Sequence, residues 1–273
     1  MNSTSISINS STLARLLTCV CLYACASVVH AQSFGTVSLS EENAGKDCGS
    51  YGGGIYEAPK YLGAKETRIL PLPMIDYSWA NGVFAGVMNG VGINFGGDST
   101  IQYGPRLTMD IGRKVNLDSH LTGMGDIPIR LEAGGFFNVN LAQGLNANSS
   151  VQYGEGVNHR GATASVGLSY SRSFAERWTM GAGMTLNFAN ADYMQSYFGV
   201  DAIQAAKSGF KLYAPGDGLR DVCNQVFLVY GFSRDLRWVT AIGVSQLANA
   251  AKNSPLTQKS DSASVYSGLS YRF

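Results

Sequence analysis

Three segments of this chain alternate between apolar and polar residues with a period of two, which is typical of β-strands. In 161–171, Ala, Val, Leu and Tyr alternate with Gly, Thr and Ser. In 178–188, Trp, Met, Ala, Leu and Phe alternate with Thr, Gly and Asn, and in 127–141 the odd positions are apolar apart from one glycine. Strands of this length, apolar on one face, span a bilayer when tilted in a barrel wall. The pattern therefore predicts an all-β, closed antiparallel transmembrane barrel.

Weaker copies of the pattern extend the prediction to ten strands, an even number that returns the C-terminus to the side where the chain entered. The predicted strands are 49–58, 69–79, 82–96, 100–113, 127–141, 160–174, 177–189, 220–233, 236–247 and 264–273. Short turns are expected on the periplasmic side, and 114–126 becomes a long periplasmic connection. The longer pieces 142–159, 190–219 and 248–263 are expected on the outer side. If Asn89-Gly90 forms a hairpin turn, the barrel has twelve strands.

The C-terminus indicates how such a barrel closes. In the segment 265–273, Val265, Leu269, Tyr271 and Phe273 share one face, and the chain ends on that terminal aromatic. A last strand of this kind must pair with the first, because an open sheet edge cannot face lipid. An ending with Tyr271 and Phe273 also resembles the assembly signal that the barrel-assembly machinery reads.

The N-terminus has the layout of a secretory signal. Arg15 precedes an uncharged apolar run from Leu16 to Val29, which is too short for a spanning helix. Cleavage is expected between Ala31 and Gln32, with 24–26 as a second candidate site and a partial lipoprotein box at 22–25. The predicted division is a signal peptide at 1–31, a periplasmic segment at 32–48 and an outer-membrane barrel at 49–273.

Composition favours one barrel over two soluble domains. The chain has 33 glycines and 14 tyrosines, only 14% of its residues are charged, and its net charge is +1. Glycine and aromatic residues are what a barrel wall uses, and no basic tract indicates a nucleic-acid partner. Trp79, Trp178 and Trp238 all lie beside predicted periplasmic turns, where an interfacial aromatic girdle belongs. The expected location is the outer membrane of a Gram-negative bacterium, in contact with its lipid.

Two cysteines remain after signal cleavage, Cys48 and Cys223. An exported pair is by default a candidate disulfide. The predicted topology, however, separates the two residues by roughly 25 Å of membrane, and a disulfide needs Cα atoms within about 7 Å. Both thiols are therefore predicted to be free.

The candidate chemistry is sparse. The mature chain has two histidines: His120 has no candidate partner nearby, and His159, beside Arg160 and near Glu155, is expected to be a solvated loop residue. No catalytic residue, metal or cofactor is predicted. Charged residues do fall on the polar face of the predicted strands: Asp76, Arg106, Asp110, Arg130 and Glu132. We expect these residues to form a mutually neutralising network in the lumen. The alternative is a constriction that selects small solutes.

Segment 190–219 is longer than a hairpin connection needs and is rich in apolar residues. It is predicted to form an outer lid or plug, with Tyr193 and the stretch Tyr197-Phe198-Gly199-Val200 packed into the barrel mouth, because full solvation of these side chains would be unfavourable. The alternative is that this apolar surface binds an external partner, as in an adhesin.

Ordered motifs along the mature chain resemble the MipA/OmpV family of outer-membrane proteins. They are Tyr61-Leu62-Gly63-Ala64, Pro71-Leu72-Pro73, Gly112-Arg113, Tyr193-Met194, Tyr197-Phe198-Gly199-Val200, Gln204-Ala205, Ser208-Gly209, Tyr213, Gly218-Leu219, Leu247, Asn253-Ser254-Pro255 and Tyr271-Arg272-Phe273. The resemblance implies a non-enzymatic scaffold that connects a murein transglycosylase with a penicillin-binding protein. Other members are described as adhesins or porin-like proteins. In a scaffold, 32–48 and 113–126 are the expected periplasmic contacts.

Overall fold

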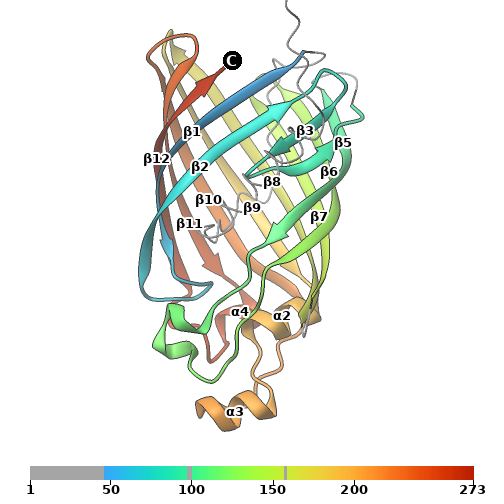
Figure 1. Ribbon diagram of the computed structural model, residues 1–273, viewed down its shortest axis with the longest axis vertical. Helices are drawn as coiled ribbons and strands as arrows, with labels where there is room; N and C mark the ends of the chain where they lie inside the picture. Colours follow the sequence, from blue (N-terminus) through green and yellow to red (C-terminus); the bar gives the residue numbers. More distant parts are fainter. Residues whose placement is uncertain (1–45, 97–99, 157–158) are drawn as a thin grey trace, which may run out of the picture.

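The computed structural model describes residues 46–96, 100–156 and 159–273, which form a closed antiparallel barrel of twelve strands (Figure 1). The strands are β1 (Cys48–Pro59), β2 (Thr67–Ser78), β3 (Val83–Gly86), β4 (Gly90–Ile93), β5 (Ile101–Asp110), β6 (Arg130–Ala142), β7 (Leu145–Gly156), β8 (His159–Ala175), β9 (Trp178–Ala189), β10 (Gly218–Gly231), β11 (Leu236–Leu247) and β12 (Asp261–Arg272). Each strand pairs with its sequence neighbours, and β1 pairs with β12. The predicted fold class is confirmed, with the alternative count of twelve strands.

The prediction of ten strands is wrong at two places. Segment 82–96 is a hairpin of β3 and β4 that turns before Gly90, which has a φ of 74°. Segment 142–159 was expected to be an outer loop but contains β7, which follows a tight turn at Gly144. The inward face of β7 carries asparagine, serine and glutamine, and its outward face includes Ser149. Such a polar composition is typical of a loop, but it also fits a barrel strand whose inward face lines a polar lumen.

These two strands also correct the position of 114–126. We call the end of the barrel that holds Cys48 and Arg272 the inner end, and the opposite end the outer end. Each added strand reverses the direction of the chain, so β4 moves the connection 111–129 to the outer end, and β7 restores the direction afterwards. The prediction of a long periplasmic connection is therefore wrong. Residues 111–129 share the outer end with 190–217 and 248–260.

The two ends of the barrel wall meet as predicted. The β1–β12 register runs from Ser50 opposite Arg272 to Glu57 opposite Val265. Beyond the strand, Phe273 exchanges two backbone hydrogen bonds with Gly49, of 3.1 and 3.0 Å. A Cβ on Gly49 would lie 2.5 Å from the Phe273 ring, so the absence of a side chain lets the terminal aromatic lie against the wall. Pairing of β1 with β12 along this register leaves neither of these two strands as an open edge toward lipid.

The outward face of the wall is apolar along most strands. Large exposed side chains include Ile55, Ile69, Leu107, Leu131, Val151, Leu168, Val226 and Ile242. Aromatic pairs lie near the inner end, with ring centroids 4.6 Å apart for Tyr77 and Trp79 and 4.6 Å apart for Trp178 and Tyr230. Among the described residues, no helix is long and apolar enough to cross a membrane.

The interior has one apolar and one polar wall. Buried Tyr56, Ala58, Leu72 and Tyr266 pack together on β1, β2 and β12. Buried polar residues face them from the far side, on β6 to β9: Asn138, Ser150, Ser165, Thr185 and Asn187. Alternation alone predicts which residues point inward, but only the closed register shows that the polar ones gather on neighbouring strands.

The two cysteines are free in the described structure, and their placement agrees with the sequence prediction. Cys48 begins β1 at the inner end, where its Sγ accepts a hydrogen bond from Arg272 Nε at 3.3 Å. Cys223 is buried in β10 opposite Ser245, close to the outer end. The predicted signal peptide, its cleavage site at Ala31-Gln32 and residues 32–45 lie outside the described residues. The barrel itself begins at Cys48, one residue earlier than predicted.

Candidate functional site

The outer end of the barrel is filled by chain from four connections, 60–66, 111–129, 190–217 and 248–260. Figure 1 shows the helices α2 (Ala191–Phe198), α3 (Ala202–Ser208) and α4 (Asn249–Lys252) gathered at this end, opposite the C-terminus. The 3-10 turns η2 (Val115–Leu117) and η3 (Ser119–Leu121) belong to the same end. We call the set of these four connections the cap.

Helix α2 is the part of the cap that contacts the barrel wall. Asn190 begins the helix, because its side-chain oxygen accepts hydrogen bonds from Tyr193 N at 3.0 Å and from Ala162 N of β8 at 2.9 Å. The backbone of Tyr193 lies directly against Gly161, where a Cβ would approach the Tyr193 Cβ to 2.6 Å. A glycine on the inner face of β8 is thus what allows α2 to seat in the mouth.

One face of α2 is buried. Tyr193, Met194, Tyr197 and Phe198 have exposed fractions of 6%, 1%, 5% and 0%. Their spacing of one and four residues places them on one side of the helix, where they pack with Ile127, Leu247 and Ala251. Asp192 and Ser196, on the opposite side, are not buried. The helix is therefore amphipathic with its apolar side toward the barrel.

Below α2 lies a charged cluster that includes three of the five predicted lumen residues. Arg130 is nearly inaccessible and contacts Asp110 at 3.2 Å and Glu132 at 3.0 Å. The Tyr197 hydroxyl donates to Asp110 Oδ1 at 2.6 Å. Two carboxylates thus share one guanidinium and one phenol, which offsets the desolvation of buried charge. The other two predicted residues lie apart. With the Gln152 amide oriented so that its oxygen faces the guanidinium, Arg106 Nε lies 3.2 Å from that oxygen. Asp76 accepts a hydrogen bond from the Asn89 amide at 3.3 Å.

A second charged pair contacts α2 from β10. Arg220 donates to Asp221 Oδ2 at 2.6 Å and to the Tyr193 hydroxyl at 3.0 Å. Asp221 is 1% exposed and also accepts from Asn187 at 2.7 Å. The sequence prediction did not include this pair. A register shift between Leu219 and Asp221 places Arg220 in a bulge, and a strict alternation of faces does not anticipate a bulge.

The two tyrosines join these clusters. Their rings stack with centroids 4.5 Å apart and an interplanar angle of 19°. The guanidinium carbon of Arg220 lies 5.3 Å from the Tyr193 centroid, and that of Arg130 lies 5.9 Å from it. Burial raises the pKa of both phenols, so both remain protonated over the whole physiological range. The stacked pair therefore connects β5 and β6 with β10 across the mouth.

Two of the other connections, 111–129 and 248–260, make polar contacts with the C-terminal end of α2. Arg113 Nη1 donates to the Tyr197 carbonyl at 2.8 Å, and burial lowers the pKa of this guanidinium. Ser254 donates to the Phe198 carbonyl at 2.6 Å. The last carbonyls of a helix lack partners within the helix, so these contacts satisfy them. Segments 111–129 and 248–260 are in this way fixed to the same helix.

Further contacts join the cap segments to one another. The Tyr61 hydroxyl donates to the Leu256 carbonyl at 3.0 Å, and Gln204 donates to the Met124 carbonyl at 2.8 Å. Val200, which belongs to the predicted plug, is 2% exposed and packs with Met124 and Leu256. The cap therefore has a hydrophobic core of its own.

The histidines are placed as follows. His120 lies at the outer end, where its Nε2 is 3.1 Å from the Pro255 carbonyl oxygen and its ring is 4.9 Å from that of Phe210. The side chain of His159 lies outside the described set. Within the described ranges, no group of three or more His, Cys, Asp and Glu side chains is arranged to hold a metal ion.

The family model described as MltA-interacting protein MipA matches residues 51–273. The chain belongs to this family. No curated protein sequence matches it. Similar solved structures include the NanC porin in a rhombohedral crystal form (TM-score 0.44, 12% identity, covering 81% of this chain and 98% of that one) and the KdgM porin (0.43, 11%, 82% and 99%). The translocator domain of the autotransporter NalP from Neisseria meningitidis is also similar (0.40, 11%, 97% and 98%).

This MipA-family protein is an outer-membrane β-barrel of a Gram-negative bacterium, as its sequence predicts. The closed strand order and the apolar outward face agree with that location. The sequence did not predict that α2 contacts charged residues of both β5 and β10.

Proposed function

We propose that this protein is a non-enzymatic outer-membrane anchor that binds a murein transglycosylase of the MltA class from its periplasmic end. In this proposal α2 keeps the outer mouth closed. The observation that carries the proposal is the buried apolar cluster that holds α2 in the barrel mouth. The family is described as MltA-interacting protein MipA, which suggests the partner. A barrel whose outer end is closed by its own packed core is suited to hold a partner rather than to pass solutes.

The seating of α2 supports a plug role for 190–200, whereas α3 has no buried residue and Ile203 and Leu212 are exposed. Phe198 and Met194 are almost completely buried, and each such side chain contributes roughly 1.5–3 kcal/mol on full burial. Polar contacts from Arg113, Ser254 and Asp110 hold the same helix. Together these contacts oppose the entropy of a free loop. The apolar face of α2 is turned away from any external partner, which disfavours the adhesin alternative for these residues.

The charged cluster supports a structural role for the lumen charges. Arg130 is shared by two carboxylates, and Arg220 is paired with Asp221. Charges neutralised in this way offer little attraction to a passing ion. A selective constriction would instead present unpaired charge to the solute.

The position of 111–129 at the outer end removes it from the expected periplasmic contacts. Among the described residues, the inner end holds the start of β1, the short turns 79–82, 143–144, 176–177 and 232–235, and the described part of the connection between β4 and β5. Arg177 and Arg234 are exposed in two of these turns. We propose that the partner contacts these turns together with the N-terminal segment.

Co-purification tests this proposal. Full-length protein in lipid nanodiscs should retain added MltA-class transglycosylase, and a variant with Arg177→Glu and Arg234→Glu should retain less. The matched control, Lys207→Glu with Lys211→Glu, changes two charges in the outer connection 190–217 and should bind as the wild type does. Equal loss in both variants, or no retention by the wild type, would contradict the proposal.

A second candidate function is a small-solute channel that opens when α2 moves. The observation that favours it is the polar wall of β6 to β9, where Ser150, Ser165 and Thr185 leave short side chains facing the lumen. Swelling of liposomes that contain the wild-type protein, in isotonic sugar solutions, would support this candidate. The anchor proposal predicts no swelling above that of empty liposomes.

A further inference from the structure

The barrel wall carries few polar side chains toward the lipid at mid-depth, and three of them are satisfied by the barrel itself. Ser149 donates to the Phe137 carbonyl at 3.0 Å, and Thr240 donates to the Tyr266 carbonyl at 2.9 Å. Ser267 accepts from Trp238 Nε1 at 3.0 Å. This is the expected solution, because hydrocarbon offers no hydrogen-bonding partner.

Asn224 is different. It lies near the middle of β10, opposite Met184 of β9 and Val244 of β11, and its side chain is exposed on the outward face. Within the described residues, its amide makes no hydrogen bond. An amide has two donors and an acceptor, and leaving them unpaired in an apolar medium is unfavourable by about 2–7 kcal/mol.

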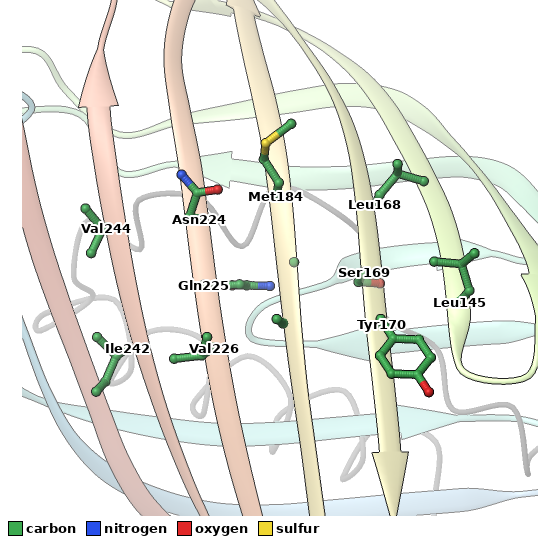
Figure 2. Close-up of a pocket in the computed structure, with 12 residues that line it drawn as sticks. Leu145, Leu168, Ser169, Tyr170, Met184, Asn224, Gln225, Val226, Ile242 and Val244 are labelled. Atoms are coloured by element: carbon green, nitrogen blue, oxygen red, sulfur yellow. The ribbon is translucent and has the colours of Figure 1, made fainter.

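The same part of the wall is hollowed. A shallow depression of about 470 Å³ is lined mainly by apolar groups of β7 to β11, with Asn224 among its lining residues. Ala182 of β9 is another of its lining residues, and it lies between Tyr170 of β8 and Val226 of β10. Figure 2 shows Asn224 between Met184 and Val244, above Val226 and Ile242. A small residue between larger ones leaves room for a side chain from outside the barrel.

We propose that β8 to β10 form a dimerisation face, on which the depression receives the same face of a second copy of this chain and the two Asn224 amides hydrogen-bond to each other. A two-fold axis that passes beside Asn224 brings this residue of one protomer next to the same residue of the other. An amide both donates and accepts, so the two side chains can form two reciprocal hydrogen bonds, as polar side chains do between membrane segments.

The chemistry of the site favours a second copy over lipid. Acyl chains can fill the depression, but at this depth they have no donor or acceptor for Asn224. A self-complementary contact needs nothing beyond the residues already present on this face. This proposal is independent of the periplasmic partner and of the cap.

Cross-linking in membranes provides the test. Asn224→Cys is placed in a background with Cys48→Ser and Cys223→Ser, so that a single thiol remains, and the protein is reconstituted in phosphatidylcholine–phosphatidylglycerol vesicles. Copper-phenanthroline oxidation should give a covalent dimer. The matched control is Leu107→Cys in the same background, a lipid-facing position on β5, and it should remain monomeric.

A second measurement covers the native side chain. Native mass spectrometry of the wild type in mild detergent should show a dimer. Asn224→Leu should weaken the dimer about tenfold, and Asn224→Ser should weaken it less. Both variants should keep heat-modifiable gel mobility, because the side chain faces outward. A monomeric wild type, equal cross-linking at position 107, or an unchanged dimer in Asn224→Leu would each overturn the proposal.

Discussion

The inner and outer ends of this barrel are built from different kinds of chain. The inner end has short turns and aromatic pairs, and its residues are largely exposed. The outer end has four longer connections with their own buried clusters around Phe198, Leu121 and Leu256. A tight turn only reverses the chain, whereas a longer connection must bury apolar surface if it is to be ordered. The difference indicates that the buried parts of the outer connections are held in one ordered arrangement.

Displacing α2 should reduce the structural difference between the outer and inner ends more than any other change. Gly161→Leu would place side-chain atoms where the Tyr193 backbone lies, so α2 cannot seat while the barrel wall stays paired. Limited proteolysis of intact cells should then cleave within α2, between Tyr193 and Phe198, at least about tenfold faster than in the wild type. Gly216→Ala, in the same connection but with open space around it, should leave the rate unchanged. Rapid cleavage of the wild type within α2 would mean that this helix is exposed and would contradict its seating.

Removing the shared guanidinium should have the next largest effect. Arg130→Met leaves Asp110 and Glu132 buried without their partner, a loss expected to destabilise the fold by about 3–5 kcal/mol. Urea unfolding followed by tryptophan fluorescence measures this change. The control is Arg160→Met, which removes an exposed ion pair with Asp192 and should change stability by less than about 1 kcal/mol. Similar midpoints for the two variants would contradict the account of the cluster.

A single hydroxyl should give a smaller change. Tyr197→Phe removes the hydrogen bond to Asp110 but keeps the stacked ring, and a bond to a charged group contributes about 1.5–3 kcal/mol. Proteolysis of the cap should accelerate, and global unfolding should change less. Tyr153→Phe, on the exposed outward face, serves as the control. An unaffected cap would show that this bond does not hold α2.

Alkaline pH should weaken the outer end and spare the inner end. Burial raises the pKa of Tyr193 and Tyr197 above their ordinary value of 10.0, so the folded cap binds protons that the open cap releases. This stabilisation is complete below pH 10 and is lost as the pH rises toward the folded pKa values. Cleavage within α2, between Tyr193 and Phe198, should therefore accelerate above pH 10. A flat rate through that range would contradict the assigned environment.

The sequence predicted the barrel well because alternation is a local signal. The segments 161–171 and 178–188 are strands with the predicted faces, and Phe273 lies at the closure. β7 escaped prediction because its polar inward face and Ser149 resemble a loop. The missed hairpin at Gly90 placed 114–126 at the wrong end, and the missed β7 restored the predicted direction of the strands that follow it.

The site could be predicted only in part. Arg130 and Glu132 are two residues apart on one strand, so their shared face was readable, and apolar content marked 190–219 as a segment to be buried. The contacts that join the cap depend on register. Asp110 meets Arg130 because β5 and β6 pair at those positions, and Arg220 reaches Tyr193 from a bulge. Nothing local in the sequence encodes either of these two contacts.

Conductance in planar bilayers tests the central claim, that α2 closes the outer mouth, most directly. The wild type should show no steady current, while a variant with Tyr193→Ala and Tyr197→Ala, which removes the stacked bridge but leaves the barrel wall intact, should open frequently. A large steady conductance of the wild type, unchanged by the two substitutions, would contradict it.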